Sequence, residues 1–89
     1  MEQRIHWQKL DTIVVLGLGQ SGRSVVRFLV GEKSPLPAHC EIHTFDSREQ
    51  PPGLDEVKQL LGEERVTAGG WQLEDLLAAD LIVVSPGLD

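Results

Sequence analysis

A short apolar segment that runs directly into three spaced glycines constrains this sequence more than any other feature. Residues 12–16 read TIVVL, and an apolar, β-branched run of this kind is typical of a strand covered on both faces in a parallel sheet. Residues 17–22 read GLGQSG and fit the pattern G-x-G-x-x-G. Apolar residues then cluster at helical spacing up to Val30. The segment therefore predicts a strand, a tight glycine turn and a helix.

The rest of the chain alternates between strand-like and helix-like segments, with breaks at glycine and proline. The predicted elements are strands over 12–16, 41–46, 65–68 and 81–84 and helices over 21–30, 54–61 and 73–79. Strands that alternate with helices imply right-handed crossovers. The sequence therefore predicts an α/β fold with a Rossmann-like, doubly wound parallel sheet, βαβαβαβ, in strand order 3-2-1-4.

The length of the chain limits it to one small domain. Its 89 residues suffice for a single core, which we expect over 12–89, with 1–11 as an N-terminal extension. The first residues contain no apolar signal core, and no apolar run reaches the roughly 18 residues that a membrane span needs. We therefore expect a cytoplasmic protein without membrane contact.

Charge is distributed unevenly along the chain. The formal net charge is −6, which disfavours binding to nucleic acid or to an anionic membrane. Residues 1–40 carry five basic and three acidic side chains, whereas residues 41–89 carry three basic and eleven acidic ones. A site for an anion is therefore expected in the first half of the chain.

The glycine pattern lies between a predicted strand and a predicted helix, as a phosphate-binding turn does. Gly17 would permit the tight turn, Gly19 the approach of a phosphate to the backbone, and Gly22 close packing of helix on strand. Asp46 ends the second predicted strand, where dinucleotide-binding folds keep a carboxylate for a ribose hydroxyl. It could equally pair with Arg48, whose planar guanidinium could otherwise cover a base or meet a phosphate.

Three functions are compatible with these features. An NAD-binding Rossmann module, regulatory or part of a dehydrogenase, would use the glycines and Asp46. An interaction domain without a ligand would use the glycines only for the turn and would suit the acidic second half. The third function is that of a nucleotide-binding domain of a larger enzyme.

No catalytic residue, metal site or cofactor site is predicted from the chain itself. His39 and His43 are four residues apart but fall in a loop and a strand, without the helical geometry of a metal pair. Cys40 is the single cysteine and has no partner thiol within the chain. Trp7 and Trp71 are expected to cap the core by packing rather than to form stacking platforms.

Three segments, in the order in which they occur, resemble the N-terminal domain of the Mur ligases. They are residues 13–22, with the glycine pattern, residues 45–54, which read FDSREQPPGL, and residues 79–87, which read ADLIVVSPG. The resemblance covers about residues 12–88. It implies that the domain binds the UDP moiety of UDP-N-acetylmuramoyl-L-alanine rather than a nicotinamide dinucleotide.

The resemblance also implies the binding residues, by their positions in these segments. The diphosphate would meet Gly19, Gln20, Ser21 and Gly22; the uridine would meet Asp46, Ser47 and Arg48; and Ser85, Pro86 and Gly87 would line the same pocket. Ser47 stands where the family often has threonine, and it keeps the hydroxyl.

For the parent protein, the resemblance implies an ATP-dependent amide-forming ligase that adds D-glutamate in peptidoglycan precursor synthesis. Such an enzyme would serve cell wall biogenesis, cell division and cell shape. It would bind ATP and magnesium in a central domain and the amino acid in a C-terminal domain. Neither domain is found in these 89 residues. We therefore expect a fragment that binds the substrate without catalysing the reaction.

Overall fold

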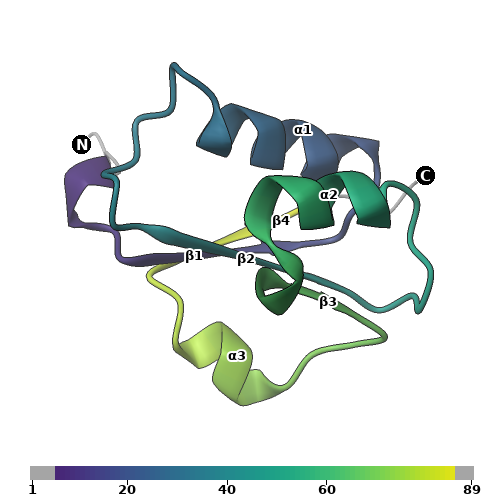
Figure 1. The fold of residues 1–89 in the computed structure, drawn as a ribbon. Coiled ribbons are helices and arrows are strands. Elements are labelled where there is room, and N and C mark those ends of the chain that lie inside the picture. The colour runs from purple at the N-terminus through teal and green to yellow at the C-terminus, as the bar shows by residue number, and fades with distance from the viewer. Residues whose placement is uncertain (1–5, 86–89) are drawn as a thin grey trace.

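Four parallel strands form one sheet in the computed structural model, which describes residues 6–85 (Figure 1). The strands are β1 (Thr12–Leu16), β2 (Glu41–Asp46), β3 (Val66–Ala68) and β4 (Leu81–Val84). Their order in the sheet is β3-β2-β1-β4, and every neighbouring pair is parallel. Both the α/β class and the strand order predicted from the sequence are confirmed.

Helices cover both faces of this sheet. Figure 1 shows α1 (Gln20–Val30) and α2 (Leu54–Leu61) on one face and α3 (Leu73–Leu77) on the other. The doubly wound arrangement is therefore confirmed. Two short 3-10 turns that the sequence patterns did not indicate are η1 (Trp7–Lys9) and η2 (Glu63–Arg65). Among residues 6–85, no helix is long and apolar enough to cross a membrane.

Three element boundaries differ from expectation. The first helix begins at Gln20, one residue early, and the other two boundaries differ because a tight turn takes up the end of the element. The third strand begins at Val66, one residue late, since the Arg65 amide donates to the Gly62 carbonyl at 3.2 Å within η2. The third helix ends two residues early, since the Ala79 amide bonds to the Leu76 carbonyl at 3.2 Å. The chain is then free to enter β4.

The main core lies between the sheet and the helices α1 and α2. Alternate strand residues point to this side, and the parallel register places Ile13 beside both Ile42 and Leu81. The buried members of the core are Ile13, Val15, Leu18, Val26, Leu29, Ile42, Val57 and Val66. Removing this apolar surface from water is the main term that stabilises the fold.

The opposite face of the sheet is covered only in part. Val14 and Phe45 are buried there, but the same face of the edge strand β4 is open. Ile82 is 39% exposed and Val84 is 68% exposed. The short helix α3 therefore covers the centre of the sheet and leaves the β4 side accessible.

Candidate functional site

A hollow of about 400 Å³ lies where the carboxyl ends of β1, β2 and β4 meet. We call it the strand-end hollow; its lining residues are Leu16, Gly17, Asp46, Ser47, Arg48, Trp71, Val84 and Ser85. Ligands of open α/β sheets bind at this edge. The fold thus brings the two segments expected to hold uridine and to line its pocket, 46–48 and the end of β4, to one place.

The glycine turn after β1 has the tight geometry that its sequence predicts. Gly17 has φ +98°, a conformation that side chains with a Cβ rarely adopt, and its amide donates to the Phe45 carbonyl at 2.7 Å. A Cβ at Gly22 would collide with the carbonyl oxygen of Gly17. The first turn of α1 therefore packs directly on the loop, as the predicted role of Gly22 requires.

The amino end of α1 is uncapped by side chains in the described part of the chain. Gly19, the N-cap, and Gly22 are buried, and the first turn contains no acidic residue. Gln20 and Ser21 are exposed. Amide groups of a first helical turn lack partners within the helix, and the helix dipole adds a partial positive charge. This end of α1 can therefore bind phosphate oxygens.

Asp46 is buried and connects the two loops of the site. It is 2% exposed, and its Oδ2 accepts a hydrogen bond from the Leu18 amide at 2.8 Å. Its Oδ1 accepts from the amide and the Nε of Arg48, at 2.8 and 3.0 Å. The hydrogen bond from the Arg48 side chain is the main cause that lowers the pKa of Asp46 to about 2. The carboxylate is thus ionised and engaged by the protein itself.

Arg48 and Ser47 provide polar groups at the surface of the strand-end hollow. The Arg48 Nη2 lies 2.8 Å from Asp46 Oδ2, while 42% of the arginine side chain stays exposed. Ser47 is exposed beside it. Because the guanidinium neutralises the buried carboxylate, an anionic ligand in the hollow does not face an unpaired negative charge.

Ser85 follows β4 and carries a polar group that lacks a partner. Its amide donates to the Leu16 carbonyl at 2.8 Å, but its buried Oγ makes no hydrogen bond within the described part of the chain. A buried hydroxyl without a partner costs free energy, and a ligand that bonds to it would offset that cost. Pro86 and Gly87, expected in the same pocket, lie outside the described residues.

The tryptophans differ from what the sequence predicted. Trp7 packs against the core, as expected. Trp71 was also expected to pack as a cap, and this was wrong: it is 43% exposed and lines the strand-end hollow. The signal in the sequence was the pair Gly69-Gly70 directly before it, which has positive φ angles of +90° and +129°. These two glycines reverse the direction of the chain and bring it back toward the end of β2.

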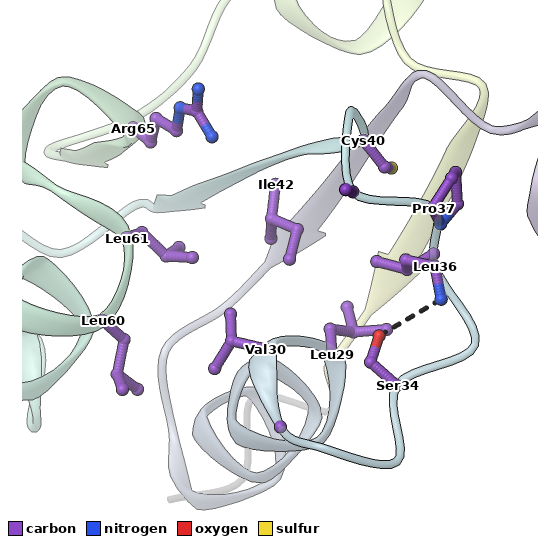
Figure 2. Close-up of a pocket in the computed structure, with 12 residues that line it drawn as sticks. Leu29, Val30, Ser34, Leu36, Pro37, Cys40, Ile42, Leu60, Leu61 and Arg65 are labelled. Carbon is purple, nitrogen blue, oxygen red and sulfur yellow. Dashed lines mark hydrogen bonds between the residues drawn. The ribbon is translucent and has the colours of Figure 1, made fainter.

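A second hollow, of about 320 Å³, lies between the carboxyl ends of α1 and α2 and the loop that precedes β2 (Figure 2). Most of its lining residues are of apolar types, with Arg65 near one end and Cys40 near the other. It contains none of the residues that the sequence predicts to bind a ligand. Because it lies at the amino ends of the strands, away from the glycine turn, it is not the candidate site.

The histidines pair with separate carboxylates. His39 Nε2 lies 2.9 Å from Asp11, and His43 Nε2 lies 3.0 Å from Glu41. Among residues 6–85, no group of three or more histidine, cysteine or acidic side chains is placed to hold a metal ion.

Comparison with known proteins matches the chain to one family. The family described as "Mur ligase MurD-like, N-terminal domain" matches residues 11–89. Relatives named UDP-N-acetylmuramoylalanine--D-glutamate ligase include those of Idiomarina loihiensis, 51% identical over 97% of this chain, and Vibrio cholerae, 42% identical over 92%. The relative from Shewanella oneidensis is 41% identical over 84% of the chain. The chain spans only 19%, 17% and 16% of the lengths of these three relatives.

Proposed function

This chain belongs to the MurD-like N-terminal domain family of the Mur ligases, and from that membership we propose that it binds the UDP moiety of UDP-N-acetylmuramoyl-L-alanine. One observation carries the proposal: the uncapped amino end of α1 and the buried hydroxyl of Ser85, which has no partner among residues 6–85, both adjoin the same glycine turn. Both offer hydrogen bonds to an anionic ligand at the carboxyl edge of the sheet.

We assign the diphosphate to the start of α1, at Gly19, Gln20, Ser21 and Gly22. Amide donors and the helix dipole favour negative charge there. Ser85 would bond to the same ligand through its buried Oγ, and Pro86 and Gly87 would extend this wall. The absence of an acidic side chain from the first turn of α1 supports the assignment.

We assign the uridine to Ser47 and Arg48, with Asp46 as the residue that positions them. The Asp46 carboxylate is 2% exposed and already accepts hydrogen bonds from Leu18 and Arg48. A dinucleotide fingerprint uses an accessible carboxylate to accept from ribose hydroxyls. The burial of Asp46 therefore favours UDP over the NAD-binding alternative.

We propose that the whole protein is an ATP-dependent ligase that adds D-glutamate to a peptidoglycan precursor in the cytoplasm. The names of the relatives support this substrate and this amino acid. ATP and magnesium would bind outside these 89 residues, in the central domain. On this proposal the present residues hold one end of the substrate, and the residues described here take no part in the chemical step.

Titration of the 89-residue chain with UDP and, separately, with NAD tests the ligand and its location together. We expect backbone amide NMR shifts at Gly19, Ser21 and Asp46 with UDP and none with NAD. Shifts with NAD alone would overturn the proposal in favour of a dinucleotide module. Shifts with neither ligand would favour an interaction domain.

A pair of charge variants tests the role of α1. Ser21→Asp places a carboxylate in the first turn, where it would repel a diphosphate, and we expect it to raise the Kd for UDP about tenfold, equivalent to about 1.4 kcal/mol. Ser24→Asp adds the same charge one turn later, on an exposed position, and we expect at most a small change. Equal effects of the two variants in calorimetry would show that the amino end of α1 is not the phosphate site.

A further inference from the structure

The strand-end hollow has two chemically different walls. One wall is polar and comes from Asp46, Ser47 and Arg48, at the end of β2. The other is apolar and comes from Leu16, Trp71 and Val84. A purely phosphate-binding site would not need an aromatic wall. The combination suits a planar ring that has apolar faces and a polar edge.

The loop that carries Trp71 is bonded to the loop that carries the polar groups. The Gly69 amide donates to the Arg48 carbonyl, and the Gly70 amide donates to the Asp46 carbonyl, both at 2.9 Å. The positive φ angles of both glycines permit this close return of the chain. These two backbone hydrogen bonds thus hold the loop that carries the indole next to the polar wall.

Trp71 also remains accessible at this position. Its exposed fraction is 43%, and Val84 on the same wall is 68% exposed. An indole that served only to complete the core would be expected to be buried more fully, as large aromatic side chains usually are. Aromatic side chains that face an open site are the usual stacking partners of nucleobases.

We propose that Trp71 stacks on the uracil ring and is the residue that makes the site prefer a nucleotide over a bare diphosphate. This inference rests on the proposed function, because it requires UDP as the ligand. It assigns base recognition to two walls: the indole covers a face of the ring, and the groups of Ser47 and Arg48 meet its polar edge. Trp71 comes from the loop after β3, outside all three segments that carry the family resemblance.

Tryptophan fluorescence gives a direct test, because the chain contains two tryptophans. In Trp7→Phe the remaining indole is Trp71, and we expect UDP to change its emission while pyrophosphate does not. In Trp71→Phe the remaining indole is Trp7, at the other edge of the sheet, and we expect no response to UDP. A response from Trp7 and none from Trp71 would overturn the inference.

Calorimetry on variants of Trp71 tests the energetic part. We expect Trp71→Ala to raise the Kd for UDP at least about fivefold, the low end for base–aromatic stacking, and to leave pyrophosphate binding within about twofold, a ratio worth about 0.4 kcal/mol. Trp71→Phe should restore most of the affinity, since it keeps an aromatic face. If Trp71 only supported the structure, Trp71→Ala would raise the Kd values for UDP and for pyrophosphate equally.

The two proposals fail in different ways in these experiments. If the unaltered chain binds UDP in calorimetry, but Trp71 emission and the affinity of Trp71→Ala do not change, then Trp71 is not a stacking residue and the UDP-binding function stands. If the unaltered chain binds no UDP at all, both proposals are overturned. Circular dichroism checks that each variant is folded; we expect the Trp71 variants to keep the fold, since 43% of that residue is exposed.

Discussion

Asp46 shows how one residue connects the parts of this site. Its carboxylate bonds to the Leu18 amide in the glycine turn, 28 positions away, and to Arg48 in its own loop. Because both oxygens are used, the position of the glycine turn relative to residues 46–48 depends on a single ionised group. Loss of that charge should loosen the two loops together.

The low pKa of Asp46 implies that the stability of the protein depends on pH. The Arg48 side chain lowers the pKa of Asp46 to about 2. A pKa lowered in the folded state stabilises the protein above the pKa of the unfolded chain, near 4, and the gain is lost as pH falls toward 2. We expect Asp46→Asn to cost about 2 kcal/mol at pH 7 and to flatten the fall in the free energy of unfolding between pH 4 and 2, in urea titrations. The same pH slope in both proteins would contradict this assignment.

Thr44 offers a change that should stabilise the protein. It is fully buried, and its Oγ1 has no hydrogen-bond partner in the described part of the chain. Thr44→Val removes the unpaired hydroxyl and keeps the shape, so we expect the free energy of unfolding to rise by about 1 kcal/mol. Thr67→Val, on the exposed side of β3, should have little effect in the same urea titration. A loss of stability in Thr44→Val would mean that the hydroxyl has a partner in solution.

At the scale of elements, the unit formed by β1, the glycine turn and α1 sets the geometry of the carboxyl edge of the sheet at the amino end of α1. This unit was correctly predicted, because each of its signals lies within a few residues of the element it defines. The short elements after α2 were predicted less exactly. The boundary residues of β3 and α3 were shifted by 3-10-type turns, whose hydrogen bonds leave no periodic pattern in the sequence.

Gly22 tests how tightly α1 packs on the turn. A Cβ at this position would collide with the Gly17 carbonyl oxygen, so we expect Gly22→Ala to destabilise the protein by about 2 kcal/mol. Gly31 ends the same helix with φ −80°, and a Cβ there would lie 3.1 Å from the Arg27 carbonyl oxygen. Gly31→Ala should therefore change thermal stability much less. Equal effects would show that α1 does not rest on the turn.

At the scale of the whole molecule, the two faces of the sheet contribute unequally to stability. The face under α1 and α2 contains the core, whereas α3 presents Leu73 and Leu77 to solvent, with exposed fractions of 68% and 74%. The sequence patterns place apolar residues on α2 and on α3 alike. Only the positions of the layers decide which of them are buried.

A pair of truncations tests this asymmetry. Val57 in α2 is fully buried, and we expect Val57→Ala to cost about 2 kcal/mol through lost burial and a residual cavity. Leu77→Ala in α3 should stay within about 0.5 kcal/mol, as an exposed change usually does. Urea unfolding at two protein concentrations measures the change in the free energy of unfolding for both variants. A large, concentration-dependent effect of Leu77→Ala would show that a second copy covers the α3 face.

The sequence by itself determined the strands and helices, their parallel order, the glycine turn and the family resemblance. The strands, the helices and the glycine turn follow from periodicity and spacing between residues close together in the chain, their parallel order follows from the alternation of strands and helices, and the resemblance rests on three segments in their order. Only the tertiary structure decided the partners of side chains. It placed Asp46 on the Leu18 amide, it placed Asp80 on the Thr12 amide 68 positions away, and it left Trp71 open beside the polar wall. The reason is physical: a carboxylate bonds to whichever amide the register and the crossovers bring near, and exposure depends on what the neighbouring layer covers.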